Sequence, residues 1–272
     1  MGIKNFLTQI KNEDWVSEIL DQQLFRESNL VDPLHPSTPI LSIRPSSSSS
    51  ACVRNIQLSM LGFREKMLPQ NLRRTRNGSA AHERWNEEFK KSNILVAANV
   101  KLKVPDIQWS GECDVIIKNP QTNINHILEI KTMNAMRYRK VPEQIKDLQE
   151  MANIMVRAEK PYMYQLAQYI HIFKDTEYTT SNVGMFLFEN TDTQEFKIRY
   201  VQPSPSLITE VFSLPLLAQE NLRNGILVEP PFARMSATCR KCYKETVCYK
   251  IQDNNQETII ALNEAIEQVR IN

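Results

Sequence analysis

The sequence predicts a mixed α/β fold, in which a small mixed sheet is flanked by helices. Two β-type runs, 113–118 and 126–131, are separated by the turn-prone segment 119–123, a pattern typical of a β-hairpin. Apolar residues at helical spacing follow in several later segments. The chain has 272 residues, of which 42% are hydrophobic and 24% are charged, as in ordinary globular proteins.

The elements are expected in the following order. An amphipathic helix at 5–26 precedes an irregular connector at 31–50, which is rich in proline and ends in a serine run. Gly78 is expected to interrupt regular structure, and a helix at 79–91 and then the hairpin follow it. The remaining expected elements are helices at 142–158, 161–174, 206–223 and 256–270, and strands at 183–189 and 196–202.

Several classes of protein are excluded by motif and composition. The six glycines form neither a dinucleotide fingerprint nor an ATPase P-loop, so any motor activity must come from a partner. No apolar run approaches the length of about 18 residues that a membrane span needs, and the N-terminus lacks a secretory signal. We therefore expect an intracellular protein without a membrane partner. Five cysteines, an odd number, favour metal ligation over a disulfide framework.

Basic residues are concentrated in three runs, although the net charge is only +2. The runs occupy 64–76, 137–140 and 240–250, and the second consists of Arg137, Tyr138, Arg139 and Lys140. Any single run is compatible with ordinary solvated surface. Together, with aromatic residues interleaved, they favour a groove that follows a phosphate backbone by charge and base stacking.

The hairpin carries the residues best suited to chemistry. Alternation places Leu128 and Ile130 on one face of the second strand and Glu129 and Lys131 on the other, while Asp114 lies on the preceding strand. Paired carboxylates form a hard oxygen site for Mg²⁺ or Mn²⁺, and a nearby lysine can orient water or stabilise phosphorane charge. The alternative is a salt bridge on a solvated sheet face.

Three further candidates support the hairpin. His82 lies in the first turn of the expected 79–91 helix and can serve as a metal ligand. Gln165 and Tyr169 share one face of the 161–174 helix, opposite its apolar stripe, and can hydrogen-bond a nucleotide or the active-site residues. Each of these residues is also compatible with ordinary helix surface.

Cysteine spacing gives the strongest local metal signal. Cys239, Cys242 and Cys248 can wrap one soft metal centre, and a fourth ligand is then needed. Cys52 is the better candidate, because Cys113 lies in an apolar strand where a buried structural cysteine is expected. Spacing alone is equally compatible with zinc.

The order of these motifs resembles the RecB-like branch of the PD-(D/E)XK nucleases, in particular the iron–sulfur subset with the CRISPR adaptation nuclease, exonuclease V and the AddB nuclease domain. The resemblance covers about residues 50–250. It rests on Cys52, Gly78-x3-His82, Gly111-x2-Asp114, Glu129-x-Lys131, Gln165-x3-Tyr169 and the Cys239, Cys242 and Cys248 tail.

The resemblance implies a restriction-endonuclease-like core closed by a cysteine-ligated region. It implies that the catalytic Mg²⁺ or Mn²⁺ is bound by His82, Asp114, Glu129 and the carbonyl of Ile130. It makes Lys131 the catalytic lysine and assigns Gln165 and Tyr169 to support of the active site and of DNA binding. It further implies a mainly structural [4Fe–4S] cluster held by Cys52, Cys239, Cys242 and Cys248.

The function implied is that of a metal-dependent DNA nuclease. Within this class, the resemblance favours an exonuclease that acts on single-stranded DNA and uses metal-activated water. Residues 51–250 would form the nuclease domain, flanked by the helix and connector of 1–50 and a helix in 251–272. Two alternatives remain open. One is a nuclease subunit active only with a helicase or within a recombination, replication, repair or adaptation complex. The other is a non-catalytic nucleic-acid-binding module with a zinc-type cysteine cluster.

Overall fold

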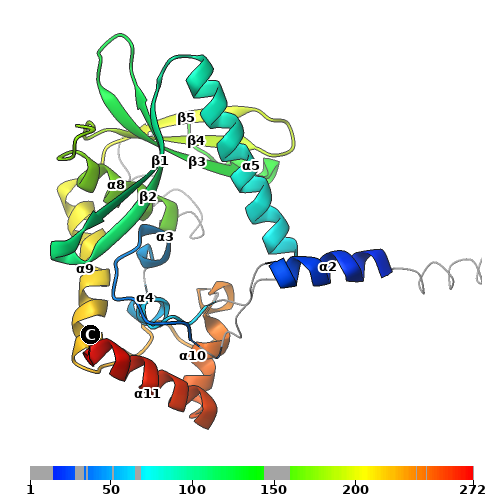
Figure 1. The fold of residues 1–272 in the computed structure, drawn as a ribbon, viewed down its shortest axis with the longest axis vertical. Helices are drawn as coiled ribbons and strands as arrows, with labels where there is room; N and C mark the ends of the chain where they lie inside the picture. Colours follow the sequence, from blue (N-terminus) through cyan, green and yellow to red (C-terminus); the bar gives the residue numbers. More distant parts are fainter. Residues whose placement is uncertain are drawn as a thin grey trace, which may run out of the picture.

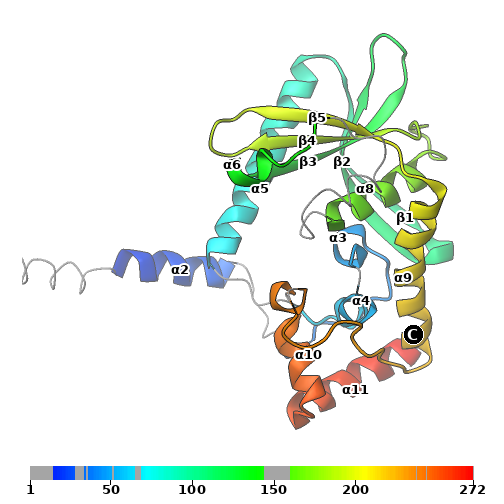
Figure 2. The same ribbon diagram turned by 180° about the vertical axis from the view of Figure 1, so that it is seen from behind.

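A five-stranded mixed sheet and a group of helices occupy opposite ends of the molecule (Figure 1). The structure is a computed structural model that describes residues 15–27, 34, 36–50, 52–64, 69–143, 160–236, 238–242 and 244–271. The sheet carries α5 and α8, while α4, α10 and α11 gather at the other end (Figures 1 and 2). Helix α9 contacts α8, α4 and α11 and so connects the two ends.

The described elements include five strands, nine helices and two 3-10 turns. The strands are β1 (Leu95–Val104), β2 (Trp109–Lys118), β3 (Asn125–Met133), β4 (Gly184–Asn190) and β5 (Phe196–Val201). The helices are α2 (Trp15–Glu27), α3 (Pro45–Ser48), α4 (Val53–Met60), α5 (Pro69–Lys91), α6 (Ala135–Tyr138), α8 (Lys160–Phe173), α9 (Pro205–Arg223), α10 (Glu245–Gln252) and α11 (Gln256–Ile271), with 3-10 turns η1 (Pro105–Ile107) and η3 (Cys239–Lys241).

The sheet confirms the predicted hairpin and the mixed α/β class. The strands lie in the order β1-β2-β3-β4-β5. All neighbouring pairs are antiparallel except β3 and β4, which are parallel and are connected through the segment that contains α8. In the hairpin, Val115 lies opposite Leu128 and Lys118 lies opposite Asn125. A crossover helix between parallel strands is the usual solution, because parallel neighbours need a long connection.

The two faces of the sheet are covered by different helices. Ile127 belongs to the larger core cluster, which includes Leu166 and Ile170 of α8. Leu128 and Ile130 belong to a smaller cluster with Phe89 of α5. The side-chain alternation expected for β3 is therefore confirmed, and it sends Glu129 and Lys131 toward the α8 side.

Helix α5 is longer than predicted. It begins at Pro69 and continues through Gly78, so the expected chain break at Gly78 is wrong. Apart from its chain neighbours and the backbone of its own helix, no described atom lies within 4 Å of a Cβ built on Gly78. A glycine within a helix lowers its stability without ending it when the flanking sequence favours the helix.

The expected irregular connector at 31–50 is wrong in part. Within its described residues, Ile43 is fully buried and forms a parallel bridge with Trp109 at the edge of the sheet. Pro45–Ser48 form the short helix α3, which packs against α8. This segment therefore contributes to the core.

One expected helix falls partly, and another almost wholly, outside the described residues. The structure describes α2 at Trp15–Glu27 but not the earlier part of the helix expected at 5–26. Only 142 and 143 of the helix expected at 142–158 are described, and they form no helix. Among the helices that are described, none combines the length and the apolar character needed to cross a membrane.

Candidate active site and thiol cluster

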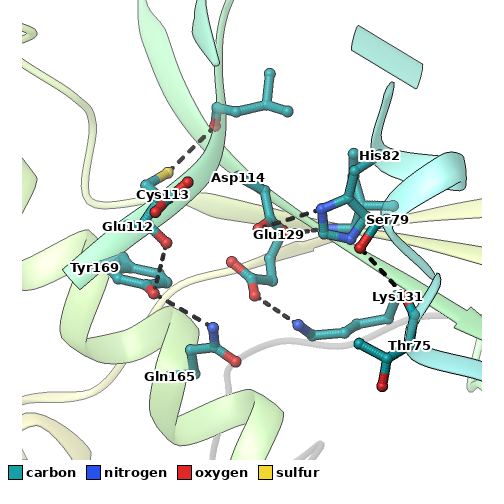
Figure 3. A network of polar contacts seen from close by, with 12 residues as sticks. Thr75, Ser79, His82, Glu112, Cys113, Asp114, Glu129, Lys131, Gln165 and Tyr169 are labelled. Atoms are coloured by element: carbon teal, nitrogen blue, oxygen red, sulfur yellow. Dashed lines mark hydrogen bonds and ion pairs between the residues drawn. The ribbon is translucent and has the colours of Figure 1, made fainter. Parts of the chain in front are cut away.

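Two carboxylates meet at the point where β2 and β3 stop pairing (Figure 3). The antiparallel ladder ends at Val115 and Leu128, and the next residues are Asp114 and Glu129. Asp114 Oδ2 accepts a hydrogen bond from the backbone N–H of Ile130 at 2.9 Å. The Asp114 side chain thus satisfies a strand N–H beyond the end of the ladder, and this bond fixes one carboxylate beside the other.

Glu129 and Lys131 form a buried ion pair. Lys131 Nζ lies 2.6 Å from Glu129 Oε1, and the side chains are 16% and 0% exposed. The alternative of a salt bridge on a solvated sheet face is therefore wrong. The second oxygen, Oε2, is buried and has no hydrogen-bond partner among the described residues. An unsatisfied carboxylate oxygen is costly in a protein interior, and it is a donor atom available to a cation.

The pKa values of both Glu129 and Lys131 are raised, for different physical reasons. Burial raises the pKa of Glu129 to about 8; the Lys131 ammonium opposes this rise, and the Asp114 carboxylate adds to it. Burial lowers the pKa of Lys131, but the charges of Glu129 and Asp114 outweigh that effect and raise the pKa overall. A carboxylate pair with a perturbed pKa and one unpaired oxygen is a common feature of functional sites.

His82 reaches the same place from α5. Its Nδ1 lies 3.6 Å from Asp114 Oδ1, and the two side chains are 29% and 15% exposed. Because α5 begins at Pro69, the expectation that His82 occupies a first helical turn is wrong. The packing of Phe89 and Trp85 against the sheet sets the position of α5 and so brings His82 to the hairpin.

Gln165 and Tyr169 brace the strand that carries Asp114. The Tyr169 hydroxyl donates to the carbonyl oxygen of Glu112 at 2.8 Å, and Gln165 Nε2 donates to that hydroxyl at 3.3 Å. Tyr169 is 2% exposed and belongs to the core, so the expectation that it lies opposite the apolar stripe is wrong. Its ring approaches Gly111 so closely that a Cβ there would lie 2.9 Å from Tyr169 Cε1.

Tyr162 is a site residue that the sequence reasoning missed. Lys131 Nζ lies 4.9 Å from the centre of its ring, within cation–π range. Tyr162 precedes Gln165 by three positions on α8 and therefore shares a face with it. That spacing was the available signal.

The four predicted cysteine ligands come together at the other end of the molecule. Cys52 immediately precedes α4, Cys239 begins η3, Cys242 directly follows η3, and Cys248 lies in α10. All four are free thiols, as is Cys113, which is fully buried in β2 as expected.

These four thiols are close enough to affect one another. Burial raises the pKa of Cys52, the backbone N–H of Asn55 opposes the shift, and Cys242 and Cys239 add to it. Burial raises the pKa of Cys248 to about 11, Arg54 opposes this, and the other three thiols add to it. Cys52, and not Cys113, therefore lies beside the C-terminal cysteines, while its role as the fourth metal ligand stays a prediction.

The carboxylate cluster and the thiol cluster differ in the ions that their donor atoms suit. Within the described ranges, no three His, Cys, Asp or Glu side chains are arranged so as to hold a metal ion. The chemistry of the two donor sets is distinct. Carboxylate oxygens and an imidazole suit Mg²⁺ or Mn²⁺, whereas four thiolates suit zinc or an iron–sulfur cluster.

The basic run after the hairpin is only partly suited to the predicted nucleic-acid contacts. Arg137, Arg139 and Lys140 are exposed. Tyr138 is 7% exposed, and Lys197 Nζ lies 4.5 Å from the centre of its ring. The expectation that Tyr138 stacks on bases is therefore corrected, because its ring packs against the protein.

Comparison with known proteins leaves the family resemblance as a prediction. No protein-family model and no curated protein matches the chain. Among solved structures, the crystal structure of SSO0001 is similar over 86% of this chain and 96% of that chain, with 14% identity and a TM-score of 0.44. A similarity at this level carries no argument about function.

Proposed function

We propose that this protein is a metal-dependent DNA nuclease and, within that class, an exonuclease that acts on single-stranded DNA. The observation that carries the proposal is the buried Glu129, whose unpaired Oε2 lies in the cluster that holds Asp114 and Lys131. A folded protein retains such a costly group where it serves a function. The motif order resembles that of the RecB-like PD-(D/E)XK nucleases, which supplies the reaction class.

The proposed divalent site is built from His82, Asp114, Glu129 and the carbonyl of Ile130. The donor set fits Mg²⁺ or Mn²⁺, and the unpaired Glu129 oxygen is the atom that most requires a cation. When bound, the ion would polarise the scissile phosphate and lower the pKa of an attacking water.

Lys131 has two tasks in this proposal. Its ammonium holds Glu129 by the 2.6 Å contact and leaves the other carboxylate oxygen available. The same positive charge, placed next to the reacting phosphate, would stabilise the negative charge that develops during hydrolysis. The ring of Tyr162 limits where the ammonium can move.

The thiol cluster is proposed to hold a structural [4Fe–4S] cluster through Cys52, Cys239, Cys242 and Cys248. The support is the proximity of four thiols from segments far apart in the sequence. Zinc is the alternative occupant, and it belongs to the alternative of a non-catalytic nucleic-acid-binding module. Metal analysis distinguishes them, because only the cluster contains iron and inorganic sulfide.

The testing experiment is cleavage of end-labelled linear and closed circular single-stranded DNA, with and without Mg²⁺ or Mn²⁺. Wild type is compared with Lys131→Met, which keeps the aliphatic stem, and with Lys101→Met, which removes an exposed lysine on β1. We expect metal-dependent loss of the linear strand with wild type and Lys101→Met, and none with folded Lys131→Met.

Each other result changes the proposal in a defined way. Loss of the circle as well would add endonuclease activity. Full activity of Lys131→Met would refute the assignment of the hairpin as the active site. Absence of cleavage by the folded, metal-loaded wild type would favour a subunit that depends on a helicase, recombination, replication or adaptation partner, or a binding module.

A further inference from the structure

We propose that Arg54 and Asn55, in the first turn of α4, are positioning residues for the metal centre of the thiol cluster. They would supply N–H donors and positive charge to its sulfur atoms. This inference rests on the proposal that the four thiols hold a metal, and it applies to an iron–sulfur cluster and to zinc alike. It assigns a role to two residues that no sequence motif singled out.

The guanidinium of Arg54 is buried, and one of its two terminal nitrogens has no hydrogen-bond partner among the described residues. Arg54 is 2% exposed, its Nε donates to the carbonyl oxygen of Val228, and its second terminal nitrogen lies 3.4 Å from Glu229 Oε2. The remaining nitrogen, Nη1, is buried and has no hydrogen-bond partner in the described part of the chain. A buried cationic N–H group without an acceptor is strongly unfavourable, so its presence indicates an acceptor that completes the site.

The thiol cluster is the neighbour that can provide this acceptor. Arg54 follows Cys52 by two positions and acts electrostatically on Cys248. The next residue, Asn55, donates from Nδ2 to Cys242 Sγ at 3.0 Å. The first turn of α4 therefore places a positive charge near Cys248 and an N–H donor at Cys242. The same turn directly follows a third thiol, that of Cys52.

Charge explains why the centre needs these neighbours. Four thiolates around zinc, or around an oxidised [4Fe–4S] cluster, leave a net negative charge in a partly buried place. A buried charge is expensive unless it is paired or hydrogen-bonded. Hydrogen bonds to the sulfurs and nearby positive charge stabilise such centres and set their reduction potentials.

The experiment uses the full chain, purified anaerobically, with metal and sulfide content measured first. The test variants are Arg54→Gln, which removes the charge, Arg54→Lys, which keeps it, and Asn55→Leu, which removes the amide donor. Two variants serve as controls. Glu229→Gln removes the charge of the exposed partner of Arg54. Gln57→Leu removes two hydrogen bonds to the segment 226–228, which Arg54 also contacts through Val228 O, because Gln57 donates to Ile226 O and accepts from Val228 N.

The first readout is the rate at which metal passes to a chelator. We expect release from Arg54→Gln and Asn55→Leu to be at least about tenfold faster than from wild type, the lower range for loss of a residue that supports metal ligands. Glu229→Gln should match wild type. Release from Gln57→Leu as fast as from Arg54→Gln would overturn the proposal, because anchoring of the 226–228 segment would then be the whole role of Arg54.

The second readout applies if the metal is iron. Loss of the Arg54 charge should shift the reduction equilibrium about tenfold toward the oxidised cluster, which is 59 mV for a one-electron couple. Arg54→Lys should retain the wild-type potential within that interval. A metal-loaded wild type with unchanged release and potential in both Arg54 variants refutes this inference alone. A wild type that binds no metal after reconstitution refutes the proposed thiol-bound metal, and this inference with it.

Discussion

Glu129 is the side chain whose environment is hardest to explain without a ligand. Its carboxylate is fully buried, one oxygen is paired with Lys131, and the other has no partner among the described residues. A buried ion pair contributes little net stability, because desolvation offsets its attraction. The arrangement is therefore better explained by a cation that binds the second oxygen than by folding alone.

Replacing one oxygen of Asp114 tests whether a cation binds beside Glu129. In Asp114→Asn the side-chain oxygen can still accept from the Ile130 N–H, so the hairpin should persist while one negative charge is lost. We expect Mn²⁺ to raise the melting temperature of wild type but not that of Asp114→Asn, since binding would weaken by more than about 100-fold. Thermal unfolding with and without Mn²⁺ measures this.

The matched control for Asp114 is Glu112→Gln, which neutralises an exposed carboxylate on the same strand. Glu112 lies 3.7 Å from Lys101 at the surface, and its side chain is 49% exposed. This variant should keep the full Mn²⁺ response. If both variants lose the Mn²⁺-dependent rise in melting temperature equally, Mn²⁺ binding depends on the overall negative charge of the strand. The proposed ligand set would then be incorrect.

The burial of Glu129 marks the limit of prediction from sequence at this site. Alternation along β3 correctly places Glu129 and Lys131 on the face opposite Leu128 and Ile130. It gives no information on whether α8 covers that face. Burial depends on packing between segments far apart in the chain, and for the same reason the contact between Tyr162 and Lys131 was missed.

At the scale of elements, strands and helices with clear periodicity were predicted and less regular ones were missed. The 206–223 and 256–270 helices are confirmed as α9 and α11. Strand β1 was missed, although Val100, Leu102 and Val104 alternate with lysines. In α5, the glycine at 78 was given more weight than the helix-favouring residues around it, and the helix was predicted too short.

Two glycines give a matched prediction about these elements. In Gly78→Ala the new methyl group meets none of the described atoms within 4 Å, so we expect about 0.5–1 kcal/mol of added stability from reduced backbone entropy. In Gly111→Ala the methyl group would lie 2.6 Å from Trp109 and 2.9 Å from Tyr169, and overpacking should destabilise by about 1–3 kcal/mol. Denaturant unfolding of both variants measures the difference, and a destabilised Gly78→Ala would contradict the continuous α5.

At the scale of the molecule, the two candidate sites belong to different groups of elements, which α9 connects through its contacts with α8 and α4 (Figure 2). The carboxylate cluster lies on the sheet, between α5 and α8, whereas the thiols lie beside α4 and α10. A metal at the thiols would join residue 52 to residues 239–248. Such a link acts on folding stability through the long loop that it closes, and not on the chemistry at the hairpin.

Cys52→Ser tests that link. With metal bound to wild type, we expect the variant to be less stable by up to about 5 kcal/mol, the chain-entropy value for a cross-link that closes a loop of roughly 190 residues, as between Cys52 and Cys239. After removal of metal from both proteins, their stabilities should agree closely. Unfolding curves for the four samples decide this, and an equal deficit with and without metal would show that Cys52 acts by packing alone.

DNA binding is a property of the whole charged surface, and its salt dependence tests the proposed path of the strand. Arg139 and Lys140 are exposed directly after α6, a few residues beyond Lys131. If each neutralises one phosphate, the slope of log affinity against log salt should become shallower by about 1.4 in Arg139→Gln/Lys140→Gln, because single strands give about 0.7 per phosphate. Lys101→Gln/Lys103→Gln removes the same charge from β1 and should leave the slope unchanged. Fluorescence anisotropy with labelled single-stranded DNA, in a buffer without divalent metal, measures both. Equal changes of the slope in the two double variants would show that DNA binding depends only on the net charge of the protein. The proposed path of the DNA beside the hairpin would then be refuted.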